Sequence, residues 1–102
     1  MSVKPMAMPC QALIYSRHAF ERMFQRGIPP EAVEHLIHQG EVIAEYPDDR
    51  PYPSALILGF FADTPVHAVV ARDEATGDCQ VITVYCPDPM LWDATFKKRK
   101  QA

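Results

Sequence analysis

The sequence predicts an α+β domain in which two N-terminal helices pack on a four-stranded antiparallel meander, followed by a short C-terminal helix. Apolar residues recur at helical spacing as far as residue 39, and β-rich runs separated by turn signals follow Gly40. The chain has 102 residues, of which 48% are hydrophobic, and this is enough for one core. We therefore expect a flexible leader over residues 1–11, a single domain over residues 12–96 and a basic tail over residues 97–102.

A short strand over residues 12–15 is expected to precede the first helix. Ser16 is a favourable N-cap, and Gly27 is a favourable residue at the C-terminal end of the helix. Apolar side chains share one face of this helix: Ala19, Phe20, Met23 and Phe24. Cationic side chains spaced four residues apart lie on the opposite face: His18, Arg22 and Arg26. This pattern is typical of an amphipathic helix whose apolar face enters the core.

A second helix is predicted from Pro30 to Gln39. It begins with proline, has acidic residues in its first turn and ends before Gly40. His35 and His38 lie one turn apart, a spacing that two metal ligands on a helix can use. The sequence places no third ligand beside them, so surface pairing with neighbouring glutamates is the favoured interpretation, and we expect no metal and no cofactor.

Four strands are predicted after Gly40, over residues 41–46, 55–62, 66–72 and 79–86. The proline-rich loop PDDRPYPS separates the first two strands. The run DEATGD predicts a hairpin turn between the last two, with Gly77 in the left-handed region. The final stretch, PDPMLWDATFKKRK, predicts an extended segment and a short last helix.

The register of the last hairpin can be predicted from its pattern of polarity. If residues 75–77 form a three-residue loop, His67 lies directly opposite Tyr85, with Thr83 diagonal to it. Apolar residues then share the other face of the hairpin: Val66, Ala68, Val70, Ile82, Val84 and Cys86. A shift of one residue would mix polar and apolar side chains on both faces, so the first register is preferred.

Composition limits the classes of protein that fit. The three cysteines are odd in number and form no C-x-x-C pair, which argues against a disulfide framework and for a reducing cytoplasm. No apolar run approaches the ~18 residues of a membrane span, so we expect no membrane partner. The net charge of −3 disfavours indiscriminate binding to nucleic acid. Four of the ten Lys and Arg residues are nevertheless Lys97–Lys100, which form either a solvated end or a tail that steers phosphate groups.

Three motifs follow one another along the chain: SRHAFERMFQRGI at residues 16–28, YPDDRPYPS at residues 46–54 and PVHAVVARDEATGDCQVITVYCPDP at residues 65–89. In these motifs the chain resembles, over about residues 15–99, a widespread and poorly characterised prokaryotic family of small domains. That family is distantly similar to toxins of the BrnT, MqsR and RelE type, which are compact α+β ribonucleases. The resemblance implies a toxin-like, RNA-directed protein, with endoribonuclease activity of the mRNA interferase type as the enzymatic hypothesis. It also implies RNA and a zinc-binding or DNA-binding antitoxin as partners.

Metal-independent RNA cleavage needs a general base, a general acid and cations near the phosphorus. His67 is the candidate base or acid because the unperturbed pKa of histidine lies near neutrality. Tyr85, its expected neighbour, could orient it or donate a proton, and His18 could supply the complementary proton transfer. Arginine side chains are the candidates for substrate binding: Arg22, Arg26, Arg50 and Arg72.

Each candidate also has a structural interpretation. His67 could be a half-buried histidine with satisfied ring nitrogens, and His18 could bond to the backbone near the start of its helix. Arg22 and Arg26 could pair with Glu21 or with the acidic segment 41–49, and Arg50 could be a turn former. The alternative function is a non-catalytic binding module that docks an acidic protein or a nucleic-acid backbone on the cationic helix face. The sequence leaves the oligomeric state open.

Overall fold

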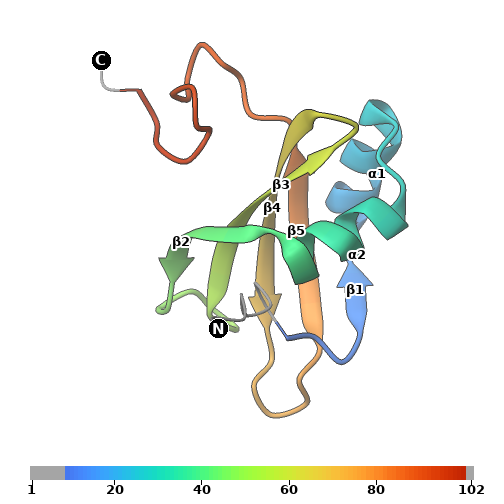
Figure 1. The fold of residues 1–102 in the computed structure, drawn as a ribbon. Helices are drawn as coiled ribbons and strands as arrows, with labels where there is room; N and C mark the ends of the chain where they lie inside the picture. The colour runs from blue at the N-terminus through green and yellow to red at the C-terminus, as the bar shows by residue number, and fades with distance from the viewer. Residues whose placement is uncertain (1–8, 101–102) are drawn as a thin grey trace, which may run out of the picture.

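The computed structural model describes residues 9–100, which form two helices and a five-stranded mixed sheet (Figure 1). The elements follow one another as β1 (Leu13–Tyr15), α1 (Arg17–Arg26), α2 (Pro30–Gln39), β2 (Glu41–Tyr46), β3 (Ser54–Phe61), β4 (Thr64–Arg72) and β5 (Cys79–Tyr85). Most of the expected leader, residues 1–8, and the last two residues of the expected basic tail lie outside the described residues.

The predicted four-stranded antiparallel meander is wrong, because a fifth strand adds a parallel pair. The strand order is β1-β5-β4-β3-β2. Leu13–Tyr15 pair in parallel with Cys79–Val81, while the other three strand pairs are antiparallel. The added strand covers the outer edge of β5, which would otherwise present unpaired backbone groups. Local patterning predicts a strand at residues 12–15 but contains no signal for its distant partner.

Both helices lie where the sequence predicts them. The Ser16 hydroxyl accepts a hydrogen bond from the Ala19 N–H at 2.9 Å, and Gly27 ends α1 with φ of 66°. A left-handed φ favours glycine, so this position suits the residue that occupies it. The second helix begins at Pro30 and ends before Gly40.

The predicted apolar face of α1 is only partly buried. Ala19 and Met23 are buried, but Phe20 is 49% exposed and Phe24 is 89% exposed. α1 packs against β5, beside the short edge strand β1, and the Phe20 ring lies against Tyr15 of that strand, with ring centroids 5.0 Å apart. The sheet is therefore too narrow here to cover both phenylalanines.

The predicted register of the last hairpin holds for its open end and shifts by one residue nearer the turn. His67 pairs with Tyr85, as expected, and the pairs continue to Val69↔Thr83. A bulge follows, so that Val70 pairs with Val81 and Ile82 is 41% exposed. A bulge inserts one extra residue and exchanges the faces beyond it. The expected burial of Ile82 with Val70 is thus wrong, whereas Gly77 has the expected positive φ.

The core lies between the helices and one face of the sheet. Its buried residues come from both helices, the connection between them and three strands: Ala19, Met23, Ile28, Val33, Leu36, Ile37, Ile57, Val66, Ala68, Val70, Cys79, Val81 and Val84. At Gly59 the helix α2 lies directly on β3, because a Cβ atom there would approach the Leu36 Cβ to 2.5 Å. Glycine permits this close approach.

The C-terminal segment, residues 87–100, forms turns and an isolated bridge between Trp92 and Arg99 in place of the expected short helix. Asp88 and Asp93 each accept a hydrogen bond from the backbone N–H two residues later. Such local bonds compete with helix formation, and prolines at 87 and 89 restrict the backbone further. In Figure 1 this segment, drawn in red, lies well away from α1.

Cys10 and Cys79 form a disulfide, contrary to the expectation from the cysteine count, and Cys86 is free. The bond attaches the chain before β1 to the first residue of β5. Two further contacts hold the same region: Arg72 Nε donates to the Pro9 carbonyl at 2.8 Å, and the Gln11 N–H donates to the Gly77 carbonyl at 2.8 Å. The expected cytoplasmic location relied on reduced cysteines, so the disulfide removes its main argument. Within residues 9–100 no helix is both long and apolar enough to cross a membrane.

Candidate functional site

Helix α1 presents a row of three basic side chains, His18, Arg22 and Arg26, which we call the cation row. All three residues are exposed. Successive members are one turn apart, which corresponds to a rise of about 6 Å along the helix axis. Between residues 9 and 100 the ion pairs are Arg17 with Glu21 and Lys97 with Glu41. Neither Arg22 nor Arg26 therefore makes the ion pairs with Glu21 or segment 41–49 that a structural role would use.

Two basic residues of α1 lie in its first turn, where they do not help the helix. Its first turn contains Arg17 and His18 and no acidic residue. The N-terminal end of a helix carries partial positive charge, so cations there are unfavourable and acids are favourable. α2 follows the favourable arrangement, with Glu31 in its first turn and His38 in its last. Helix stability thus accounts for Arg26 in the last turn of α1 but not for the basic residues of its first turn.

His67 lies on the opposite face of the sheet from α1. Its strand neighbours Val66 and Ala68 belong to the same core cluster as Ala19 of α1. Because successive side chains of a strand alternate between faces, His67 points towards the C-terminal segment instead. There its ring makes edge contacts with Trp92, at a centroid distance of 4.5 Å, and with Tyr85 at 5.2 Å. The residue is fully buried.

Both ring nitrogens of His67 are used by neighbouring groups. Nε2 lies 2.7 Å from the Phe96 carbonyl oxygen, and Nδ1 lies 3.1 Å from the Tyr85 hydroxyl. A carbonyl only accepts, so Nε2 carries the proton and donates it, and Nδ1 of the neutral ring accepts from the Tyr85 hydroxyl. Burial lowers the pKa of His67, and the bond to the Phe96 carbonyl partly opposes this effect. Burial likewise raises the pKa of Tyr85, so the phenol stays protonated.

The candidate catalytic residues therefore do not form one site. The structure brings His67 and Tyr85 together, as the register predicts, but it places them under the C-terminal segment. His18 lies on α1, which covers the other face of the sheet. A histidine pair that transfers protons to and from one phosphate needs both rings within hydrogen-bond reach of the substrate. The sheet lies between His18 and His67, so these two rings cannot act on one phosphate.

The two remaining arginine candidates lie near the opposite end of the molecule from α1. Arg50 is an exposed residue of the loop between β2 and β3. Arg72 ends β4, and its Nε bonds to the Pro9 carbonyl. Figure 1 shows the loop between β2 and β3 at the lower left and α1 at the upper right, so Arg50 does not extend the cation row.

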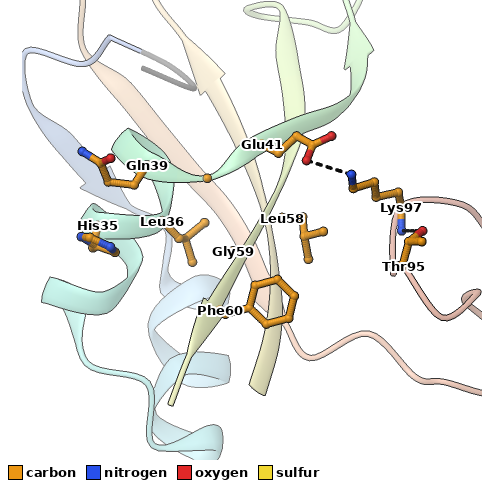
Figure 2. Close-up of a pocket in the computed structure, with 10 residues that line it drawn as sticks. His35, Leu36, Gln39, Glu41, Leu58, Gly59, Phe60, Thr95 and Lys97 are labelled. Atoms are coloured by element: carbon orange, nitrogen blue, oxygen red, sulfur yellow. Dashed lines mark hydrogen bonds and ion pairs between the residues drawn. The ribbon is translucent and has the colours of Figure 1, made fainter. Parts of the chain in front are cut away.

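A cavity that sequence patterning does not indicate lies at the sheet edge where β2 begins (Figure 2). It has a volume of about 450 Å³. Its walls come from α2, β2, β3 and the C-terminal segment: His35, Leu36, Gln39, Gly40, Glu41, Leu58, Gly59, Phe60, Thr95 and Lys97. These four parts of the chain are distant in sequence. In the sequence, Lys97 and His35 stand out as polar residues, but neither indicates which other segments form the walls of the cavity with it.

Metal-ligand geometry is absent from the part of the chain that the structure describes. No group of three His, Cys, Asp or Glu side chains there is arranged to hold an ion. His35 and His38, the pair spaced one turn apart on α2, are accompanied by Glu31 and Glu34 around a shallow depression of about 400 Å³.

These features define a small α+β domain with a cationic helix on one face of its sheet and a buried histidine on the other. The chain belongs to the family described as a domain of unknown function (DUF4258), whose model matches residues 15–86. The match ends at Cys86, so the C-terminal segment that covers His67 lies beyond it. No curated protein and no solved structure matches the chain significantly. The comparisons do not link the chain to toxins of the BrnT, MqsR or RelE type.

Proposed function

We propose that this protein is an RNA-binding domain that holds the RNA backbone on the cation row of α1. The observation that carries the proposal is the exposure of Arg22 and Arg26 on successive turns, with no ion pair to either guanidinium from residues 9–100. A guanidinium presents several N–H donors in a plane and binds phosphate oxygens through two parallel hydrogen bonds. His18 extends the row by one turn.

The charge balance favours a weak and salt-sensitive interaction. The whole chain has a net charge of −3, so at long range it repels RNA weakly. Local contacts on α1 must then supply most of the binding. The unfavourable position of His18 in the first turn supports a role outside the protein, because it offers the helix no electrostatic benefit.

The geometry favours binding over cleavage. A catalytic histidine must reach the 2′-hydroxyl or the leaving oxygen of the substrate. Both nitrogens of His67 are bonded to protein groups, and the side chain has no exposed surface. The proposal therefore retains the RNA-directed part of the toxin-type expectation and assigns His67 and Tyr85 to the support of the C-terminal segment.

Fluorescence anisotropy with a labelled single-stranded RNA tests the proposal. The double variant Arg22→Gln/Arg26→Gln removes two charged donors and should weaken binding at least about tenfold. It should also reduce the slope of log K against log salt by about 1.4 between roughly 50 and 200 mM salt. Arg50→Gln is the matched control, since this exposed arginine lies in the loop between β2 and β3, away from α1, and its loss should change the affinity little.

Incubation of the same RNA with wild-type protein should leave it intact. Equal RNA affinity of the wild type and the double variant would refute the cation row as the binding site. Cleavage by the wild type that is lost in His67→Gln would restore the ribonuclease hypothesis. Absence of any RNA binding, together with binding of an acidic protein that depends on Arg22 and Arg26, would assign α1 to a protein partner instead.

A further inference from the structure

We propose that the cavity shown in Figure 2 is a nucleotide-binding site, in which the base stacks on Phe60 and the phosphate binds Lys97. This inference goes beyond RNA binding on α1 and does not depend on it. The volume of about 450 Å³ lies in the range of small-ligand sites, roughly 300–1,000 Å³. The ligand class is a nucleotide, either free or at the end of an RNA strand.

The sheet edge creates an open aromatic wall. Pairing of β2 with β3 begins at Glu41↔Leu58, and Glu41 is the first residue of β2. Gly59 and Phe60 of β3 therefore extend beyond the start of β2 and have no partner in it. Phe60 is 58% exposed, and Figure 2 shows its ring beside the hollow that Leu36 and Leu58 also border. An aromatic ring exposed beside a polar cavity is a platform for stacking, and every nucleobase offers a face to it. Stacking would cover apolar surface that is now in contact with solvent.

A cation stands on the opposite wall. Lys97 Nζ lies 3.0 Å from Glu41 Oε1, and both side chains are about half exposed, at 45% and 46%. An ion pair with this exposure is weak, so it orients the lysine without preventing the ammonium from binding an anion. Lys98, Arg99 and Lys100 follow directly and are exposed. Of the cationic residues in this run, Lys97 lines the cavity and so offers its ammonium group to a phosphate.

Polar groups on the α2 side complete the site. His35 and Gln39 are exposed residues that line the cavity. The amide of Gln39 provides both donors and an acceptor, and so can bond to the edge of a base held against Phe60. Figure 2 shows Gln39 and His35 on the helix at one side, with Lys97 and Thr95 at the other. A ligand with a flat apolar face, a polar edge and an anionic group matches these walls.

Isothermal titration calorimetry with adenosine monophosphate, adenosine and inorganic phosphate tests the site. Phe60→Ala should weaken the binding of adenosine monophosphate at least about tenfold, because the stacking platform is lost. Phe60→Tyr keeps an aromatic ring and should bind with the affinity of the wild type. Lys97→Gln should weaken the binding of adenosine monophosphate at least about fivefold and leave the affinity for adenosine, which has no phosphate, unchanged. Phe24→Ala removes another exposed phenylalanine, on α1, and should leave the affinity for adenosine monophosphate unchanged.

A short RNA with or without a terminal phosphate distinguishes the source of the nucleotide. Loss of terminal-phosphate recognition in Lys97→Gln would assign the cavity to an RNA end, and binding of adenosine monophosphate alone would assign it to a free nucleotide. The proposal is overturned if adenosine monophosphate does not bind at millimolar concentration and the RNA is indifferent to Phe60→Ala. Binding of inorganic phosphate alone would overturn it equally. Arg22→Gln/Arg26→Gln should leave the calorimetric result unchanged, which separates failure here from failure on α1.

Discussion

His67 connects the sheet to the C-terminal segment through Nε2, while Nδ1 bonds within the sheet. One bond runs to a side chain of β5, the Tyr85 hydroxyl, and the other to a backbone carbonyl at Phe96. Trp92 covers the ring edge-on. A buried polar group with all its partners stabilises one arrangement of its surroundings, since any rearrangement leaves a donor or an acceptor unpaired. The residue that most resembled a catalytic base is thus explained by its packing.

Protonation of His67 should destabilise the protein. The pKa of His67 in the folded state is lowered by burial, so the unfolded chain binds the proton more readily. The stabilisation is complete above the unfolded pKa of about 6.5 and is lost as pH falls below it, by at most about 1.4 kcal/mol per pH unit. Urea unfolding at several values between about pH 7.5 and 5.5 measures this slope.

The variant His67→Gln provides the control for that pH dependence. It should be less stable at neutral pH, by roughly 1–3 kcal/mol, because at least one of the two hydrogen bonds is lost. Its stability should also depend less on pH than that of the wild type, since glutamine does not titrate. An identical slope in both proteins would mean that other groups cause the dependence, and that His67 does not remain neutral in the fold.

At the scale of elements, helices are predictable here because their ends are marked locally. Ser16 and Gly27 bound the first helix, and Pro30 and Gly40 bound the second. Which side chains of a helix become buried is less predictable. Phe24 lies on the apolar face of α1 by its spacing and is still exposed. What covers a helical face depends on the width of the sheet beneath it, and this width is set by distant pairing.

A trade between stability and binding is expected on α1. His18→Glu places a negative charge in the first turn and should raise the free energy of unfolding by about 0.3–1 kcal/mol. The same change places a negative charge in the cation row and should weaken RNA binding. Thermal unfolding and anisotropy on the same samples measure the two effects.

The matched control for His18→Glu is Gln25→Glu, which adds a negative charge to the last turn of the same helix. There the helix end is partly negative, so stability should fall slightly. A loss of stability in His18→Glu would show that this residue supports the helix and that its position does not indicate a binding role.

At the scale of the whole molecule, the features that sequence patterning misses are those assembled from distant segments. The polarity of the β4–β5 hairpin predicts that His67 lies opposite Tyr85, but nothing in that pattern reveals the bulge that exposes Ile82. The parallel pairing of β1 with β5 has no local signal. The cavity walls come from four parts of the chain, and the residues that cover His67 come from a segment with neither helical nor strand periodicity.

The Cys10–Cys79 disulfide closes a loop with a sequence separation of 69, which includes both helices and four of the five strands entirely. Cross-linking over such a distance restricts the unfolded chain, and loss of the bond should lower stability by roughly 2–4 kcal/mol. Cys79→Ser, or reduction of the wild type, should therefore lower the midpoint of thermal unfolding. Cys86→Ser leaves the bond intact and should have a smaller effect.

Thiol alkylation tests the bond directly. In denaturant without a reductant, the wild type should take up one alkyl group, on Cys86, and after reduction it should take up three. Three groups without prior reduction would show that the purified chain does not contain the bond. The stability of the wild type would then be unaffected by a reductant, and residues 9–12 would keep their hydrogen bonds to Arg72, Gly77 and Cys79 of the hairpin without the covalent link.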